Sequence, residues 1–405
     1  MHRVVITGMG IYSCIGKNLT EVRQSLYEGR SGIILDPERK ELGFRSALTG
    51  FVETPDLKNF LHRRDRVGMH QPAMFAYMST REALEQAQLD VDFLDKNETG
   101  IIFGNDSTTG SVIETIDKAR KKKDNTLIGS GDIFQNMNCT VNMNLATIYK
   151  LKGINFTLSA ACASGSHSIG MGYLLIRQGL QERVICGGAQ EINPYAMTSF
   201  DGLGTFSTRE SDPQKASRTF DKNRDGLIPS GGAATVIIES LEAAQRRGAT
   251  ILAEIVGYGF SSNGDHISNP SFDGQHRSLL MAMNQAAIKP SEIDYVNAHA
   301  TSTPAGDGIE AKVIGEVISH QVPVSSTKSM TGHECWMAGA SEVIYSMLMM
   351  QNNFIAPNIN FEEPDDDTAT INVVAQTKEQ NINCFLSNSF GFGGTNSALI
   401  VRRFK

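Results

Sequence analysis

Long apolar runs are missing from the 405-residue sequence, and the longest fall well short of the roughly 18 residues that a membrane span requires. The first residues read as a strand entering a glycine turn at Gly8, unlike the charged and apolar regions of a secretory signal. The six cysteines are scattered without a CxxC pair, which argues against a zinc ribbon or a disulfide framework. The net charge of −7 disfavours nucleic-acid binding. These absences predict a cytoplasmic protein with no membrane partner, no nucleic-acid partner and no metal.

Short apolar strands alternate with helix-like segments along the whole chain, which is the pattern of an α/β protein with a largely buried sheet. A helix ends near Arg246 and a new strand begins after Thr250, so we expect two parts, residues 1–247 and 248–405. Each part ends in a glycine-marked strand pair, which is consistent with a duplicated architecture. The expected strands are Arg3–Ile6, Gly100–Phe103, Asn155–Leu158, Arg183–Cys186, Ala234–Ile238, Ile251–Tyr258, Tyr295–Asn297, Val322–Ser325, Cys384–Leu386 and Ser397–Val401, and the expected helices are Leu19–Glu28, Gln71–Ala87, Ala163–Arg177, Gln275–Ala287, Gly308–Ile318 and Gly339–Gln351.

A candidate nucleophile stands where a β-run changes into very small residues and a helix is expected to start, at Cys162. A thiol in the first turn of a helix faces unpaired backbone N–H groups and the positive end of the dipole. Both favour the thiolate, so we expect a lowered pKa. The alternative interpretation is a buried core cysteine, which is the commonest position of a free thiol.

Two histidines follow later strands in a similar way. His299 ends an apolar strand before a loop of small hydroxyl residues, where α/β folds form ligand crevices. His333 ends a second strand-and-turn segment that also contains Lys328. The glycine-rich stretch Gly391–Asn396 offers backbone N–H groups for an oxyanion. Together these segments predict a Cys-His-His site.

Two basic clusters interrupt the otherwise acidic chain, Arg63–Arg66 and Lys118–Lys123. Each is either a solvated surface or a docking site for an anionic partner.

As a set, these motifs resemble the β-ketoacyl-acyl carrier protein synthases of type II fatty acid synthesis, closest to the synthase I and II branch. The similarity runs from Val4–Gly10 through Ser217–Asp221 and Asp225-Gly226 to Gly391–Asn396. The resemblance implies a thiolase-like five-layer αβαβα sandwich built from two similar halves. The first half would carry the nucleophilic cysteine and the second half the two histidines.

The resemblance also implies an acyltransferase that performs a decarboxylative Claisen condensation. Cys162 would take the acyl chain from carrier protein and pass it to malonyl-acyl carrier protein, which gives β-ketoacyl-acyl carrier protein, CO2 and free carrier protein. His299 and His333, as neutral imidazoles, would donate hydrogen bonds to the malonyl thioester and stabilise its enolate. Lys328 and Glu310 are expected to form a supporting ion pair around His333.

Further roles come from the same resemblance. The N–H groups of Cys162 and Phe392 would form the oxyanion hole, with Phe392 also gating the site. The family is usually homodimeric and needs no cofactor of its own, because the carrier protein brings the phosphopantetheine. The expected contacts to pantetheine or substrate are Thr301, Thr303, Phe390 and Thr108, and the expected carrier-docking residues are Arg63, Arg66, Lys121, Lys122 and Lys123.

The sequence departs from the family pattern at three places. Ala300 replaces the glycine after His299, which would be costly if this position had a positive φ. Trp336, the only tryptophan, stands where glycine is common, and Asn105–Thr109 is more polar than the usual stretch of the acyl pocket. These changes leave a specialised ketosynthase for a polyene or another non-housekeeping chain as an alternative.

Other functions fit less well. The Gly8–Ser13 turn lacks the third glycine of a dinucleotide site, and the loop opening at Asp221 has Gly232 where a calcium loop needs glutamate. A thiolase would need a second late cysteine. A non-catalytic chain-length partner subunit would usually lack the nucleophile, whereas Cys162 is present.

Overall fold

A computed structural model describes all 405 residues, and its main feature is an eleven-stranded mixed sheet. The strand order is β12-β10-β9-β14-β15-β8-β1-β7-β6-β4-β5. The strands in chain order are β1 (Val4–Ser13), β4 (Gly100–Gly104), β5 (Asn155–Leu158), β6 (Arg183–Gln190), β7 (Gly232–Ser240), β8 (Ala253–Ser262), β9 (Tyr295–Asn297), β10 (Pro323–Ser325), β12 (Asn372–Val373), β14 (Cys384–Gly391) and β15 (Thr395–Arg402).

The strand order shows that the molecule is duplicated. The N-terminal half is ordered β5-β4-β6-β7-β1, and the C-terminal half repeats this arrangement as β10-β9-β14-β15-β8. In both halves the third strand is parallel to the second and antiparallel to the fourth. Three residue pairs between β1 and β8, among them Val4 with Ile255, join the halves into one ladder. The expected strand pairs β6–β7 and β14–β15 are both present.

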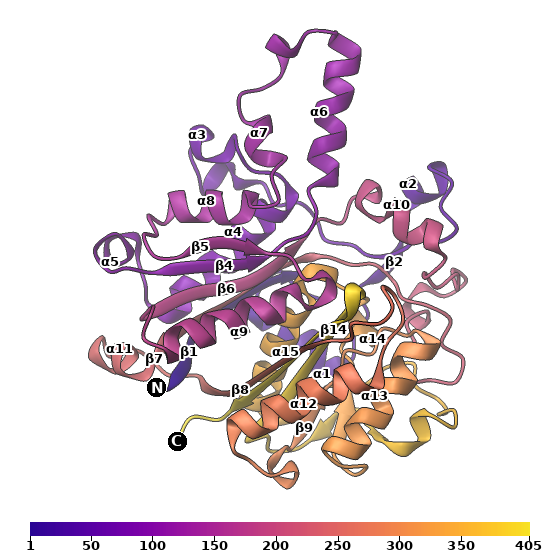
Figure 1. The fold of residues 1–405 in the computed structure, drawn as a ribbon. Coiled ribbons are helices and arrows are strands. Elements are labelled where there is room, and N and C mark those ends of the chain that lie inside the picture. The colour runs from indigo at the N-terminus through magenta and orange to yellow at the C-terminus, as the bar shows by residue number, and fades with distance from the viewer.

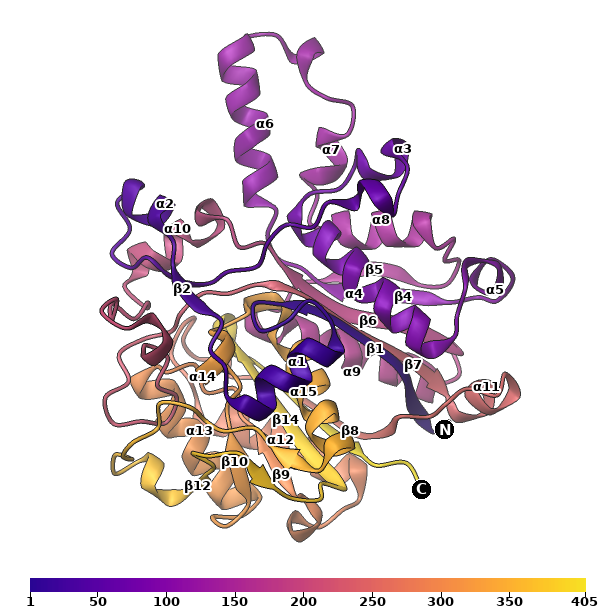
Figure 2. The same ribbon diagram turned by 180° about the vertical axis from the view of Figure 1, so that it is seen from behind.

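Helices complete the five layers of the predicted sandwich. The central layer consists of α9 (Ser164–Arg177) and α15 (Ala338–Asn352), which pack on each other and on both halves of the sheet. The outer layers are α4 (Gln71–Ala87) with α8 (Thr140–Ile148) on one side and α12 (Phe272–Ala286) with α13 (Pro304–Val317) on the other (Figures 1 and 2). The thiolase-like fold of two similar halves is thus confirmed.

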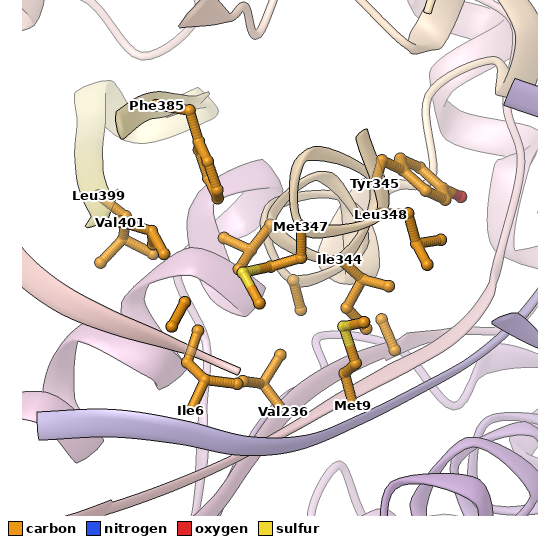
Figure 3. Packing of buried hydrophobic residues seen from close by; sticks show 14 of the residues in the cluster. Ile6, Met9, Val236, Ile344, Tyr345, Met347, Leu348, Phe385, Leu399 and Val401 are labelled. Carbon is orange, nitrogen blue, oxygen red and sulfur yellow. The ribbon is translucent and has the colours of Figure 1, made fainter. Parts of the chain in front are cut away.

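The largest core cluster surrounds α15, where every residue from Ala338 to Met350 is buried. Ile344 and Met347 project among side chains of both halves, such as Val236 and Leu399 (Figure 3). A mostly apolar helix that is buried on every side belongs in such an interior position. The central helices therefore hold the two halves in a fixed relation, on which a site between them depends.

The structure contains every predicted strand and helix, with ends that differ by a few residues. The sequence interpretation missed α6 (Thr109–Lys122), which stands out from the body of the molecule (Figure 1). Its only apolar spacing is the short set Val112, Ile113 and Ile116, and its second half is basic, so the pattern is weak in the sequence. The remaining elements are α1 (Leu19–Glu28), β2 (Ile33–Leu35), α2 (Pro37–Glu41), β3 (Leu48–Gly50), α3 (Arg63–Arg66), α5 (Val91–Lys96), α7 (Asp132–Gln135), α10 (Pro194–Leu203), α11 (Leu241–Arg246), α14 (Lys328–Thr331), β11 (Phe354–Ile355) and β13 (Lys378–Glu379).

None of these helices combines the length and the apolar character that crossing a bilayer would require.

Candidate active site

Cys162 lies in a short 3₁₀ turn, Ala161–Ala163, between β5 and α9. The prediction of a thiol within the first turn of the helix was therefore slightly wrong, because α9 begins only at Ser164. Ala161 has a φ of 46°, in the left-handed region. This conformation costs about 1 to 2 kcal/mol for a residue with a Cβ atom. The small residues around the nucleophile thus permit a sharp turn from strand to helix.

The predicted fall in the pKa of the Cys162 thiol was wrong. Burial raises this pKa to about 11, and it outweighs the opposing effects of Lys328 and of two N–H groups. Those two groups are the backbone N–H of Phe392 and that of Cys162 itself, and each lowers the pKa of the thiol. The helix dipole does not decide this pKa, because burial of the sulfur away from water disfavours the thiolate more strongly.

The two histidines converge on this sulfur. One side-chain atom each of Cys162, His299 and His333 lie within 4.8 Å of one another, and all three residues are buried. The two imidazole rings meet edge to face with centroids 5.3 Å apart. Nδ1 of His299 and Nε2 of His333 are buried without a partner, and both residues line a cavity shared with the thiol. The structure therefore brings together the three residues that the sequence singled out.

Hydrogen bonding assigns the proton on His333. The backbone N–H of Cys335 donates to Nδ1 of His333 at 3.3 Å, so this nitrogen accepts and a neutral ring carries its proton on Nε2. Burial lowers the pKa of both imidazoles well below the usual value, and the charge of Lys328 adds to the effect. His333 is thus a neutral ring whose free Nε2–H is available to a ligand in the cavity.

The predicted ion pair between Lys328 and Glu310 is not present, because each has another partner. Lys328 pairs with Glu342 of α15, and both side chains are buried. Glu310 instead accepts the backbone N–H groups of His299 at 2.8 Å and Ala300 at 2.7 Å. Glu310 therefore fixes the loop of the first histidine, whereas Lys328 places a charge close to both.

The cavity in front of Cys162 has a volume of about 360 Å³. Thr301, Thr303 and Phe390, the expected contacts to pantetheine or substrate, line it. Thr108 does not, because its hydroxyl donates to the carbonyl of Asn136 at 2.9 Å at the start of α6.

Aromatic side chains close one side of this cavity. Phe200 lines it and stacks on Phe392 with centroids 6.0 Å apart. Trp336 packs behind Phe200 at 6.4 Å and is 9% exposed. The unusual tryptophan therefore fills space beside the site and supports the aromatic wall. Ala300 raises no strain, because the residue with a positive φ in this loop is Ser302, at 71°.

The basic residues lie on projecting elements. Arg63 is exposed on α3, and Arg66 is partly buried with Nε bound to the carbonyl of Leu61. Lys121, Lys122 and Lys123 are all exposed where α6 ends.

The sequence interpretation missed two acidic residues near the site. Asp106 accepts the backbone N–H of Ala161 at 2.9 Å, and Glu334, next to His333, accepts the hydroxyl of Tyr345 at 2.7 Å. A carboxylate in a polar loop or a buried acid inside a helix start has no sequence pattern of its own. Only the prediction that Asn105–Thr109 departs from the usual pocket pointed in this direction.

A metal ion is a chemical alternative for the three converging residues, because zinc accepts cysteine and histidine ligands. The same set also suits a nucleophile with two hydrogen-bond donors.

Comparison with known proteins favours the nucleophile with two hydrogen-bond donors over the metal site. Residues 1–244 match the family "Beta-ketoacyl synthase, N-terminal domain", and residues 252–362 match "Beta-ketoacyl synthase, C-terminal domain". The chain is 43% identical over 410 residues to "3-oxoacyl-[acyl-carrier-protein] synthase 1" of Haemophilus influenzae, with all of both chains covered. It is 41% identical over 409 residues to the protein of the same name from Escherichia coli K12, again with complete coverage. A crystal structure of a β-ketoacyl synthase from Burkholderia phymatum superposes with a TM-score of 0.94 at 33% identity, covering 100% of each chain.

Proposed function

The chain belongs to the β-ketoacyl synthase family, and we propose that Cys162, His299 and His333 carry out its chemistry. It is an acyltransferase that condenses an acyl chain with malonyl-acyl carrier protein in fatty acid elongation, releasing CO2. The observation that carries the residue assignment is the convergence of one buried thiol and two imidazole rings, each with an unpartnered nitrogen, around one cavity.

In the first half-reaction, the sulfur of Cys162 attacks the thioester carbonyl of an acyl-carrier protein. The negative charge that develops on the carbonyl oxygen is stabilised by hydrogen bonds from the N–H groups of Cys162 and Phe392, two residues that line the cavity. The tetrahedral intermediate then collapses, and the pantetheine thiol leaves with the proton that the cysteine gave up. The acyl chain remains on Cys162 beside the aromatic wall of Phe200.

In the second half-reaction, His299 and His333 hold the thioester oxygen of malonyl-carrier protein. Cleavage of the bond to the carboxylate releases CO2 and leaves the electron pair as an enolate, which the Nε2–H of His333 stabilises. A neutral imidazole suits this step because it donates a hydrogen bond without protonating the carbanion. The enolate carbon then attacks the acyl thioester, and the sulfur of Cys162 leaves.

The positions of the other predicted residues support separate roles. Glu310 fixes the His299 loop, and Lys328 with Glu342 keeps a charge next to the two rings. Thr301 and Thr303 offer hydroxyls to the pantetheine arm along the cavity. The enzyme needs no metal or organic cofactor of its own in this proposal, because the pantetheine arrives on the carrier.

The family acts on carrier-protein substrates, and we propose that the basic residues receive the acidic carrier. Arg63 on α3 and Lys121 and Lys123 at the end of α6 are exposed to an anionic surface, whereas Lys122 is exposed but donates to the carbonyl of Leu127 at 2.9 Å. The docking set comprises Arg63, Arg66, Lys121, Lys122 and Lys123.

We also propose a homodimer in the cytoplasm. β5 is an edge strand of the sheet, and its Phe156 is 38% exposed. An open edge with an apolar side chain invites pairing with another strand. The neighbouring α6–α7 region adds exposed apolar side chains at Val112, Ile116, Ile133, Phe134 and Met137. The division into residues 1–247 and 248–405 stays a prediction, supported by the end of α11 at Arg246 and the start of β8 at Ala253.

The roles of the histidines can be separated from that of the cysteine by following each half-reaction. His299→Ala and His333→Ala should still form an acyl adduct on Cys162 but should release little CO2 and no condensed product. Intact-protein mass and product chromatography measure the two steps, and His2→Ala at the exposed N-terminus is the control. A panel of acyl chains in the same assay shows whether a specialised chain is preferred. A His333→Ala variant that condenses at the wild-type rate would refute the role assigned to His333.

A further inference from the structure

Asp106 lies just beyond the carboxyl end of β4, against the turn that carries Cys162. Oδ2 of its carboxylate accepts the backbone N–H of Ala161 at 2.9 Å, and Oδ1 accepts the hydroxyl of Ser159. The two donors precede the nucleophile by one and three residues. The carboxylate therefore fastens the chain immediately before Cys162.

The N–H of Ala161 has no backbone partner, because the residue is left-handed and stands outside the helix. The second half of the molecule repeats this geometry at Cys335, whose φ is 47° at the start of the equivalent turn before α15. There the N–H is accepted by Nδ1 of His333. In each half, one side chain thus accepts the N–H of the left-handed residue, and in the first half that side chain is Asp106.

The charge of Asp106 acts on the nucleophile as well. Burial raises the pKa of this carboxyl, while the Ala161 N–H opposes the rise. A negative charge here raises the pKa of the Cys162 thiol, whereas Lys328 lowers it. The other groups facing the sulfur are the uncharged rings of His299 and His333 and the buried thiol of Cys335.

We propose that Asp106 is a positioning residue that holds the turn of Cys162 for acyl transfer. The inference rests on the proposed role of Cys162 as nucleophile. Its carboxylate contacts backbone and hydroxyl groups of the turn and has no part in holding the malonyl thioester, which falls to the two histidines. Loss of Asp106 should therefore affect the acyl-transfer half-reaction and spare decarboxylation.

Two substitutions separate geometry from charge. Asp106→Asn keeps an oxygen for the Ala161 N–H and an amide that can donate to Ser159, but it removes the charge. We expect acyl transfer close to that of the wild type and a pH profile of Cys162 alkylation displaced to lower pH. Asp106→Ala removes both hydrogen bonds, and we expect acyl transfer to fall by about tenfold or more. Malonyl decarboxylation, followed as CO2 release, should stay within about twofold of the wild type.

The control is Asp92→Asn, an exposed carboxylate on α5 with no side-chain partner. Equal losses of acyl transfer and decarboxylation in Asp106→Ala would overturn the proposal, since they would show a merely structural role. An acyl-transfer loss of about tenfold in Asp106→Asn, which keeps both contacts, would also overturn it, and this variant serves if Asp106→Ala does not fold. Acyl transfer that persists in Cys162→Ala would instead refute the nucleophile assignment, so the two failures are distinguishable.

Discussion

Replacing Glu310 with alanine should destabilise the protein and disable His299 at the same time. The carboxylate is 1% exposed and accepts three N–H donors, from His299 at 2.8 Å, Ala300 at 2.7 Å and the side chain of Asn388 at 3.0 Å. Leaving a buried donor unsatisfied costs about 1 to 3 kcal/mol. Three of them therefore place the loss of unfolding free energy at about 3 kcal/mol or more, a large share of the stability of a typical domain.

Glu310→Gln should destabilise the protein less, because it disrupts only the hydrogen bond from Ala300. The amide oxygen can take the place of Oε1, which accepts from His299 and Asn388, but the NH2 group then faces the N–H of Ala300. We expect a loss of unfolding free energy of about 1 to 3 kcal/mol.

Decarboxylation should fall by about a hundredfold in the Glu310→Ala variant, since the loop no longer fixes the histidine.

Urea unfolding at one protein concentration measures the stability, and CO2 release measures the activity. Glu316→Ala is the control on the same helix, because that side chain is 61% exposed. A Glu310→Ala protein whose unfolding free energy lies within about 1 kcal/mol of the wild type would refute the reasoning, since three buried donors without partners should destabilise the fold by more than that.

Three further results are expected. Acylation of Cys162 should change the emission of Trp336, the only tryptophan, because it packs behind Phe200 in the cavity wall; titration with acyl-carrier protein checks this, and an unchanged spectrum contradicts it. Burial raises the pKa of Glu334 to about 7, so the native state loses stability as the pH rises from about 4.5 to 7. Relative to Glu334→Gln, the wild type should lose about 3 kcal/mol between pH 5 and 8 in unfolding experiments, and a constant difference would contradict this. Arg63→Glu with Arg66→Glu should raise KM for carrier-bound substrates about tenfold at low salt and leave kcat unchanged, whereas an equal effect on pantetheine thioesters would exclude docking.

Much of the site was predictable because its reactive side chains follow strands. Cys162 comes after β5 and His299 after β9, and such strand ends collect ligand-binding groups in α/β folds. The mirrored strand order could not be read from the residues, because the two halves share no obvious repeat. The sequence features that indicated this duplication were the glycine-marked strand pairs β6–β7 and β14–β15.

Partners and protonation were harder to predict, since they depend on packing between distant segments. Lys328 has Glu342 as its partner because α15 returns past the site, and nothing in the local sequence marks that contact. The pKa of Cys162 was predicted in the wrong direction because a helix start is visible in the sequence while the apolar surroundings are not. Asp106 was overlooked because its role depends on the left-handed φ of Ala161.

The central claim is that Cys162 carries the acyl chain, and intact-protein mass tests it most directly. The wild type, Cys162→Ala and the neighbouring Cys335→Ala would each be mixed with acyl-carrier protein and weighed. The account predicts an adduct of one acyl group on the wild type and on Cys335→Ala, and none on Cys162→Ala. An adduct on folded Cys162→Ala, or none on the folded wild type with any acyl chain, would contradict it.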